Sequence, residues 1–183
     1  MPMRVIAGKL RHRHLVYPEN NKDIRPTKDR IREAIFSSLG DIENMTFLDL
    51  CAGSGSIGIE AISRGVKKSY FVDNNVASLK YIKENLNSLN IVNQSEIIAD
   101  DALKALKKFS LESIKFDIVY FDPPYKSDLY DSVIPYILNN NLLNNNGVLV
   151  VESDFKLDTN NISNYKIKEY HYGEIYVSVL RKF

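Results

Sequence analysis

From residue 46 onward, short apolar runs alternate with segments whose apolar residues recur at helical spacing. The runs predict buried strands at 47–51, 69–73, 96–99, 116–121 and 147–151, and the spacing predicts helices at 57–64, 76–89, 102–108 and 128–138. Strands separated by helices form βαβ units, which build a parallel sheet with right-handed crossovers. Two further extended stretches, 166–172 and 174–180, flank Gly173 and are expected to pair antiparallel. The pattern therefore predicts a doubly wound α/β sheet that is mostly parallel and carries an antiparallel C-terminal hairpin.

The first 40 residues follow a different pattern. Residues 4–17 indicate two short strands around a turn at 8–11, as in a β-hairpin. Thr27 is a good helix N-cap, an apolar face follows at Ile31, Ile35 and Leu39, and Gly40 suits the end of this helix. We therefore divide the chain into a short N-terminal extension of hairpin plus helix, residues 1–40, and a main α/β domain, residues 41–183.

Charge adds a second difference between the two parts. The whole chain carries a net charge of +1, but residues 1–35 hold nine basic and four acidic residues. A basic extension on a mildly acidic body suggests a polyanionic partner, although a solvated basic surface would look the same. His12 and His14 lie among these basic residues, but two histidines without a third ligand do not indicate a metal site.

The composition is ordinary for a globular protein, with 44% hydrophobic and 26% charged residues in 183. No apolar run approaches the roughly 20 residues of a membrane-spanning helix, and residues 1–13 contain no apolar stretch of signal-peptide length. The single cysteine, Cys51, excludes an internal disulfide and a cysteine-built metal site. We expect a cytoplasmic protein, monomeric and without a metal.

The turn after the first strand of the main domain contains a glycine motif. Gly53, Gly55 and Gly58 satisfy G-x-G-x-x-G between a strand and a helix, and Asp73 ends the next strand 18 residues after Gly55. Both nicotinamide dinucleotides and S-adenosylmethionine are bound by such a turn. Acids follow or lie within the predicted strands at Asp49, Asp73, Asp100, Asp101 and Asp122. This acidic rim would repel a pyrophosphate and favours a cationic methyl donor, although strand-end acids alone could also bind a metal or be incidental.

The sequence D-P-P-Y at 122–125 ends the strand 116–121, because proline lacks the amide hydrogen that a sheet needs. In isolation it could be only a stiff turn. In this setting the Asp122 carboxylate and the Pro123 carbonyl can accept the two hydrogens of an exocyclic amine, which turns the amine lone pair toward a methyl group. Tyr125 offers a flat face on which an extruded base can stack.

These features together resemble the class I S-adenosylmethionine-dependent methyltransferases, whose D-P-P-Y version acts on exocyclic amines of bases or on a glutamine amide. The glutamine-modifying enzymes usually begin this motif with Asn, so Asp122 favours a base. More specifically, the chain resembles the RsmD family of 16S rRNA guanine-N2 methyltransferases. The similar segments are RVIAGKLR at 4–11, RPTKDRIREAIF at 25–36, DLCAGSG at 49–55, EAISRG at 60–65 and the D-P-P-Y motif.

The resemblance implies a role for each matching residue. Catalysis would be carried by Asp122, Pro123 and Tyr125. S-Adenosylmethionine would be bound by Asp49, Ala52, Gly53, Ser54, Gly55, Asp73, Asn74, Asp100, Asp101, Ala102 and Asp122, with Asp73 on the ribose and Asp101, or else Asp100, on the adenine amine. The RNA would be contacted by Arg4, Lys9, Arg11, Arg13, Arg25, Thr27 and Arg30. Cys51 stands where the family commonly has an aromatic residue, and we expect it to be buried in the core rather than to act as a nucleophile.

The leading hypothesis is therefore transfer of a methyl group to N2 of a guanine in 16S rRNA, free or within the small ribosomal subunit or an assembly intermediate. A DNA amino-methyltransferase acting on adenine N6 or cytosine N4 shares the central motifs, but such enzymes usually carry a sizeable target-recognition domain. A nicotinamide-dependent oxidoreductase shares the glycine turn, but no helical Tyr-x-x-x-Lys supports it. A further alternative is a non-catalytic RNA-binding protein, for which replacement of Asp122 by alanine would leave the function intact.

Overall fold

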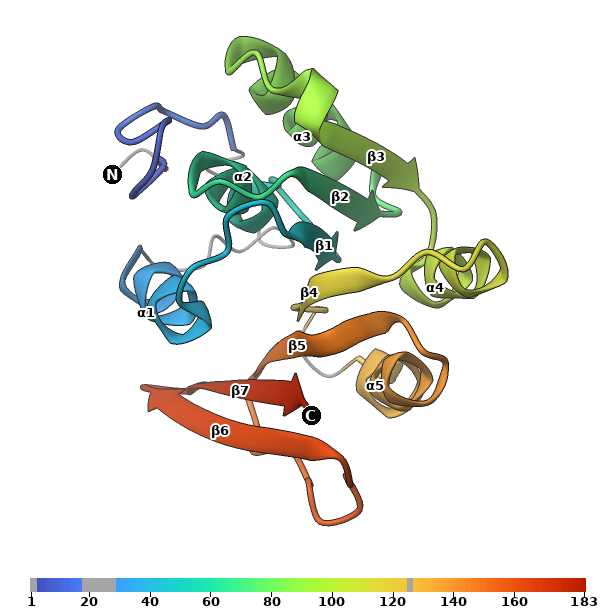
Figure 1. Ribbon diagram of the computed structural model, residues 1–183. Helices are drawn as coiled ribbons and strands as arrows, with labels where there is room; N and C mark the ends of the chain where they lie inside the picture. The colour runs from blue at the N-terminus through green and yellow to red at the C-terminus, as the bar shows by residue number, and fades with distance from the viewer. Residues whose placement is uncertain (1–2, 18–28, 125–126) are drawn as a thin grey trace.

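The computed structural model describes residues 3–17, 29–124 and 127–183. In this part of the chain seven strands form one sheet in the order β3-β2-β1-β4-β5-β7-β6 (Figure 1). Their bounds are β1 Thr46–Leu50, β2 Lys68–Asp73, β3 Ser95–Ala99, β4 Phe116–Phe121, β5 Leu143–Ser153, β6 Tyr165–Tyr172 and β7 Ile175–Lys182. Strands β1 to β5 pair in parallel, whereas β7 is antiparallel to both β5 and β6. The predicted doubly wound sheet with an antiparallel C-terminal hairpin is confirmed.

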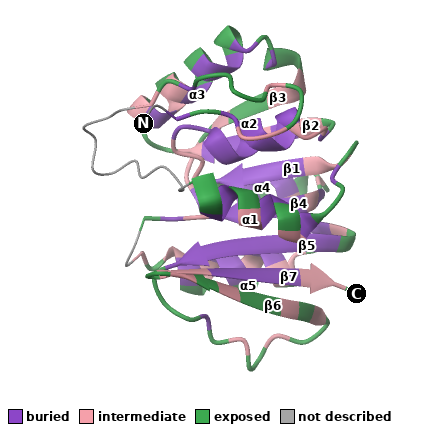
Figure 2. Cartoon of the chain, turned by 90° about the vertical axis from the view of Figure 1, so that its left-hand side faces the viewer, coloured by how far each residue is buried: buried purple, intermediate pink, exposed green. Residues whose placement is uncertain are grey.

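Helices cover both faces of the sheet, as Figure 1 shows. Their bounds are α1 Asp29–Leu39, α2 Ser56–Ser63, α3 Val76–Ser88, the 3-10 helix η1 Val92–Gln94, α4 Ala102–Leu111 and α5 Leu129–Asn139. Apolar residues of α1, α2 and α3 share one core cluster, and those of α4 and α5 share the other. Figure 2 shows the central strands buried between these layers. Because both faces are covered, β1 and β4 are near-continuous apolar runs, which made them recognisable in the sequence.

Strand β5 is longer than expected. It begins at Leu143 rather than at Gly147, and its pairing with β4 shifts register between Phe116 and Ile118. The Asn144 side chain donates a hydrogen bond of 2.8 Å to the Asp117 carboxylate, and Asn146 has a φ of 62°. The asparagine-rich segment therefore forms an irregular start of the strand, which its polar composition hides.

The N-terminal segment, residues 3–17, folds back on itself, but the two predicted strands do not form. An isolated antiparallel bridge joins Arg4 and His14, and the segment also packs on α2 and α3 (Figure 1). We call residues 3–17 the N-terminal loop. The completely buried Glu60 carboxylate of α2 accepts hydrogen bonds from the backbone N–H groups of Ile6 and Ala7, at 2.8 and 3.0 Å. The Val5 N–H also donates to the Arg13 carbonyl and the Leu15 N–H to the Met3 carbonyl, both at 2.9 Å, so the two arms pair antiparallel as in the predicted hairpin, although neither arm forms a regular strand.

The loop and α1 share a core with the main domain. Met3, Val5 and Leu15 of the N-terminal loop are buried in the same cluster as α1, α2 and α3. The division at residue 40 stays a prediction about domains, and these contacts make both parts one packed unit. The proposed N-cap of α1, Thr27, lies outside the described residues.

Candidate functional site

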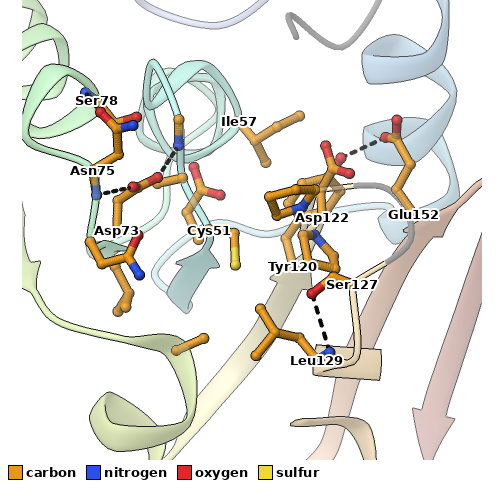
Figure 3. Close-up of a pocket in the computed structure, with 18 of the residues that line it drawn as sticks. Cys51, Ile57, Asp73, Asn75, Ser78, Tyr120, Asp122, Ser127, Leu129 and Glu152 are labelled. Carbon is orange, nitrogen blue, oxygen red and sulfur yellow. Dashed lines mark hydrogen bonds between the residues drawn. The ribbon is translucent and has the colours of Figure 1, made fainter. Parts of the chain in front are cut away.

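A cavity of about 320 Å³ lies at the carboxyl ends of β1, β2, β4 and β5 (Figure 3). Strands β2 and β4 lie on either side of β1, and their connecting helices lie on opposite faces of the sheet. This is the position at which open α/β sheets bind ligands. The predicted site residues that line the cavity are Asp49, Ala52, Gly53, Ser54, Asp73, Asn74, Asp100, Asp101, Ala102, Asp122 and Pro123. The structure therefore brings together residues that are spread over 75 positions of the sequence.

The glycine turn is fastened to the end of β2 by Asp73. One carboxylate oxygen of Asp73 accepts a hydrogen bond from the Gly53 N–H and the other from the Asn75 N–H, both at 2.8 Å. Gly53 and Gly55 have φ values of 56° and 78°, which a residue with a side chain rarely adopts. Burial raises the pKa of Asp73, and the backbone N–H groups oppose this increase. The two ends of neighbouring strands thus form one rigid wall of the cavity.

Asp49 supports the same turn from beneath. Its side chain is 1% exposed and accepts a 2.8 Å hydrogen bond from the Gly58 N–H at the start of α2. Burial raises the pKa of Asp49 to about 8. At neutral pH this acid therefore holds a proton for most of the time and contributes little negative charge to the cavity.

The start of α4 forms a second wall of the cavity. The Asp101 carboxylate caps this helix by accepting hydrogen bonds from the N–H groups of Leu103 and Lys104, at 3.0 and 3.3 Å. Asp100 accepts a 2.8 Å hydrogen bond from the Asp101 N–H. Both acids and Ala102 line the cavity, so either carboxylate can reach a ligand there.

The end of β4 closes the cavity on the side of β5. Asp122 and Pro123 line it, together with Pro124. The Asp122 N–H lies 3.5 Å from the Leu50 carbonyl, so β4 stays beside β1 up to this residue. Tyr125 lies outside the described residues, as do Arg25 and Thr27, and their roles stay predictions.

The sequence reasoning missed several residues of the cavity, above all Glu152 at the end of β5. Its side chain is 3% exposed and accepts a 2.7 Å hydrogen bond from the Tyr120 hydroxyl (Figure 3). Burial raises the pKa of Glu152, and the hydrogen bond from Tyr120 opposes this increase. The rule that drew attention to Asp73 and Asp122, an acid directly after an apolar strand, also applies to Glu152 and could have found it. Asn75, which caps α3, and the apolar Ile57 and Ile175 also line the cavity.

Cys51 differs from its expected position. The residue is partly exposed, has a φ of 66° and lines the cavity, although it also packs against the core on the α4 side. The expected packing against the core is present, but the burial is only partial because β1 ends at Leu50 and the chain turns at Cys51. Burial and the surrounding carboxylates raise the pKa of the thiol, so it stays protonated and is a poor nucleophile.

The basic residues predicted to contact RNA fall into two places. Arg4 and Arg30 are exposed near the start of α1, where Arg4 lies 3.9 Å from the Asp29 carboxylate. Lys9, Arg11 and Arg13 lie in the second place, beyond the C-terminal end of α2. The Lys9 ammonium donates to the Gln94 side chain at 2.6 Å, just before β3, and Arg13 donates to the Ser88 carbonyl at 3.0 Å, at the end of α3. These three residues are therefore near the amino ends of the strands, on the edge of the sheet opposite to the cavity.

Two absences among the described residues bear on other classes of function. No helix in residues 3–17, 29–124 or 127–183 is long and apolar enough to cross a membrane. The same residues contain no group of three or more His, Cys, Asp or Glu side chains that could hold a metal ion.

Comparison with known proteins adds family information to this geometry. Residues 3–181 match the model of the family described as conserved hypothetical protein 95. Ribosomal RNA small subunit methyltransferase D of Haemophilus influenzae is 36% identical over 154 residues, which cover 83% of this chain and 79% of that protein.

Solved structures agree with the fold. The structure titled "Putative methyltransferase yhhF from Escherichia coli" superposes with a TM-score of 0.87 at 27% identity and covers 100% of this chain and 98% of that chain. An RNA methyltransferase from Salinibacter ruber in complex with S-adenosyl-L-homocysteine superposes with a TM-score of 0.68 at 14% identity and covers 86% and 94%. The second similarity shows the fold alone.

Proposed function

The chain belongs to the conserved hypothetical protein 95 family, the RsmD family, and we propose that it transfers a methyl group from S-adenosylmethionine to N2 of a guanine in 16S rRNA. The observation that carries this proposal is the cavity that unites the glycine turn, Asp73 and the Asp122-Pro123 strand end. A ligand held by the turn would place its reactive group beside Asp122. The acids around the cavity suit a cationic donor better than a pyrophosphate.

The residues of the cavity fit the methyl donor. Asp73 is held by two backbone N–H groups at the tip of β2, where a carboxylate can accept hydrogen bonds from ribose hydroxyls. Asp101, or else Asp100, lies at the start of α4 for the adenine amine, and Ala52, Gly53 and Ser54 would hold the methionine portion. Gly55 is not among the residues that line the cavity, and with its φ of 78° it would shape the turn. When bound, S-adenosylmethionine supplies an electrophilic methyl group on a sulfonium sulfur.

The chain's own contribution to transfer lies at Asp122 and Pro123. The lone pair of the guanine amine is delocalised into the ring, so the amine is a weak nucleophile. Hydrogen bonds from N2 to the Asp122 carboxylate and the Pro123 carbonyl would orient this lone pair toward the methyl group. The methylated amine is acidic and loses a proton readily, so no strong base is required. Tyr125 would stack on the extruded base.

The RNA would cross the face that carries the N-terminal loop and α1. Arg4 and Arg30 would contact phosphates close to the cavity, whereas Lys9, Arg11 and Arg13 would contact phosphates beyond the opposite edge. Contacts at both edges require an extended RNA surface, such as the small ribosomal subunit or an assembly intermediate offers. We propose that a monomer acts on this particle in the cytoplasm.

Mass mapping of modified guanines tests the proposal directly. 16S rRNA from cells that lack the protein should lose one N2-methylguanine, and the purified protein with S-adenosylmethionine should restore it on rRNA or small subunits from those cells. Calorimetry should detect binding of S-adenosylmethionine. Binding of NADH instead, or methylation of duplex DNA but not of rRNA, would contradict the proposal.

We expect Asp122→Ala to abolish methyl transfer while S-adenosylmethionine binds with an affinity within about tenfold of the wild type. The reason is that Asp122 would contact the amine, whereas Asp73 and the glycine turn would hold most of the donor. Single-turnover rates and calorimetry on the same preparations measure the two effects. Asp128→Ala, an exposed acid six residues further on, is the control and should transfer at the wild-type rate. Full activity of Asp122→Ala would exclude this mechanism.

A further inference from the structure

Glu152 is a buried acid in the cavity to which the proposed transfer assigns no role. Phe121 of β4 and Val151 of β5 are register partners in a parallel pair, so Asp122 and Glu152 are the next residues of neighbouring strands. Adjacent residues of neighbouring strands point their side chains to the same face of the sheet. Both side chains line the same cavity, and Figure 3 shows Glu152 and Asp122 on the same side of it.

Two tyrosines hold Glu152 in place. The Tyr120 hydroxyl donates to one carboxylate oxygen at 2.7 Å, and the Tyr130 hydroxyl donates to the Glu152 backbone carbonyl at 2.9 Å. A carboxylate oxygen has two lone pairs, and the carboxylate can accept more hydrogen bonds than the single one from Tyr120. The acid is therefore fixed in direction and retains capacity to accept a hydrogen bond from a ligand.

The edges of the three amine-bearing bases differ beside the amine. Guanine has a second donor, N1–H, next to N2, whereas adenine has the acceptor N1 next to N6 and cytosine has the acceptor N3 next to N4. An enzyme that acts on an extruded base reads this Watson–Crick edge by hydrogen bonds. Asp122 and Pro123 can hold the amine of any of these bases, so they cannot select guanine by themselves.

We infer that Glu152 selects guanine by accepting a hydrogen bond from N1–H while Asp122 holds the N2 amine beside it. The inference rests on the proposed function, because it names a determinant of the base that the same site takes. Two neighbouring carboxylates match two neighbouring donors, and a carboxylate facing N1 of adenine or N3 of cytosine would set two acceptors against each other. Ile57 and Ile175 line the same cavity and offer apolar surface to the rings. Glu152 thus acts as a specificity residue.

A purely structural role for Glu152 is the alternative, since its bonds to Tyr120 and Tyr130 also tie β4, α5 and β5 together. Both roles predict that a change at Glu152 lowers stability. Only the specificity role predicts that the change alters the preference between bases, so the test must measure a ratio of rates for two bases.

The test uses 16S rRNA ligated to carry either guanine or 2-aminopurine at the methylated position. 2-Aminopurine keeps the amine at C2 but has an acceptor at N1. Single-turnover transfer is measured at saturating S-adenosylmethionine for the wild type, Glu152→Gln and the control Glu174→Gln. Glu174 is exposed in the turn between β6 and β7 and does not line the cavity, and its change removes the same charge.

We expect the wild type to prefer guanine by roughly 30-fold or more, as for the loss of a hydrogen bond to a charged group. The new side-chain amide of Glu152→Gln can donate to N1, so this variant should lower the preference at least tenfold, and Glu174→Gln should keep it. An unchanged preference in Glu152→Gln would overturn the inference and leave the proposed function standing. Equal rates on both bases by the wild type would overturn it without any variant, even if Glu152→Gln does not fold. Absence of transfer to either RNA by the wild type would overturn the proposed function itself.

Discussion

Asp49 shows how one buried acid couples protonation to the stability of the fold. Its pKa is about 8 in the folded protein, because burial penalises the charged form, against a value of 3.8 for an ordinary aspartate. Between these two values the folded chain binds more protons than the unfolded chain. The stabilisation from this group is therefore fully present below the unfolded pKa and is lost as the pH rises through the folded pKa.

We expect Asp49→Asn to flatten the pH dependence of stability between pH 5 and 8. In the wild type, Asp49 should lower the free energy of unfolding by up to about 1.4 kcal/mol for each unit by which the pH rises in this range. Asparagine cannot ionise and should show no such decrease. Urea unfolding at several pH values measures the slope. Asp131→Asn, an exposed acid of α5, is the matched control and should leave the slope unchanged. Equal slopes in wild type and Asp49→Asn would show that Asp49 titrates like an ordinary acid.

The N-terminal loop is an element whose arms pair antiparallel and whose position is fixed by α2. The Ser63 hydroxyl donates to the Ala7 carbonyl at 2.5 Å and accepts from the Leu10 N–H at 2.9 Å. Gly8 lies so close to α2 that a Cβ atom there would be 1.9 Å from the Ser63 carbonyl oxygen. The loop can occupy this position only with glycine at residue 8.

We expect Gly8→Ala to lower the free energy of unfolding by roughly 2–4 kcal/mol, because the added methyl group clashes with backbone and the φ of 81° is strained. Gly40→Ala separates the two effects. Gly40 has a similar φ of 77° but open space around it, so its change should cost only about 1 kcal/mol. Urea unfolding measures both. Equal costs for the two variants would mean that the loop is not packed against Ser63.

At the scale of the whole molecule, the basic residues of the N-terminal loop and the start of α1 lie at two edges of the sheet, and this gives a test of how RNA lies on the protein. Replacing Arg11 and Arg13 with Ala should weaken rRNA binding and lower the dependence of log Kd on log salt by about one unit for each phosphate that the protein no longer touches. Binding titrations at several salt concentrations measure this slope. Lys107 and Lys108, two exposed residues of α4 on the other face, give a control with the same change in charge. An unchanged slope for the arginine pair would mean that the loop faces away from RNA.

Most of the sheet could be predicted because its signals are local. The apolar runs that form β1, β2 and β4 each end beside an acid or a turn, and parallel strands bring these ends to one edge. Asp73 and Asp122 therefore reach the cavity as expected. The separate tasks of the strand-end acids could not be predicted from their positions alone. Asp49 and Asp101, for example, accept hydrogen bonds from backbone N–H groups of α2 and α4.

The features that the sequence did not reveal depend on distant partners. Glu60 is an acid on a helix whose burial follows only from the loop that packs over it. The strand start at Asn144 depends on a hydrogen bond to Asp117, 27 residues earlier. Neither a hydrophobic pattern nor a short motif carries such pairings, since both report on neighbours along the chain.

The attachment of the N-terminal loop also sets an order of folding during synthesis. The loop leaves the ribosome before its partners, which are Glu60 and Ser63, more than 50 residues later, and Asn85, which holds Val16 by two hydrogen bonds across 69 residues. The loop cannot settle until α2 and α3 have been made and packed, so it waits for at least 50 further residues before it is placed. During that interval a basic segment is exposed beside ribosomal RNA, the same class of polyanion that the finished protein is proposed to modify.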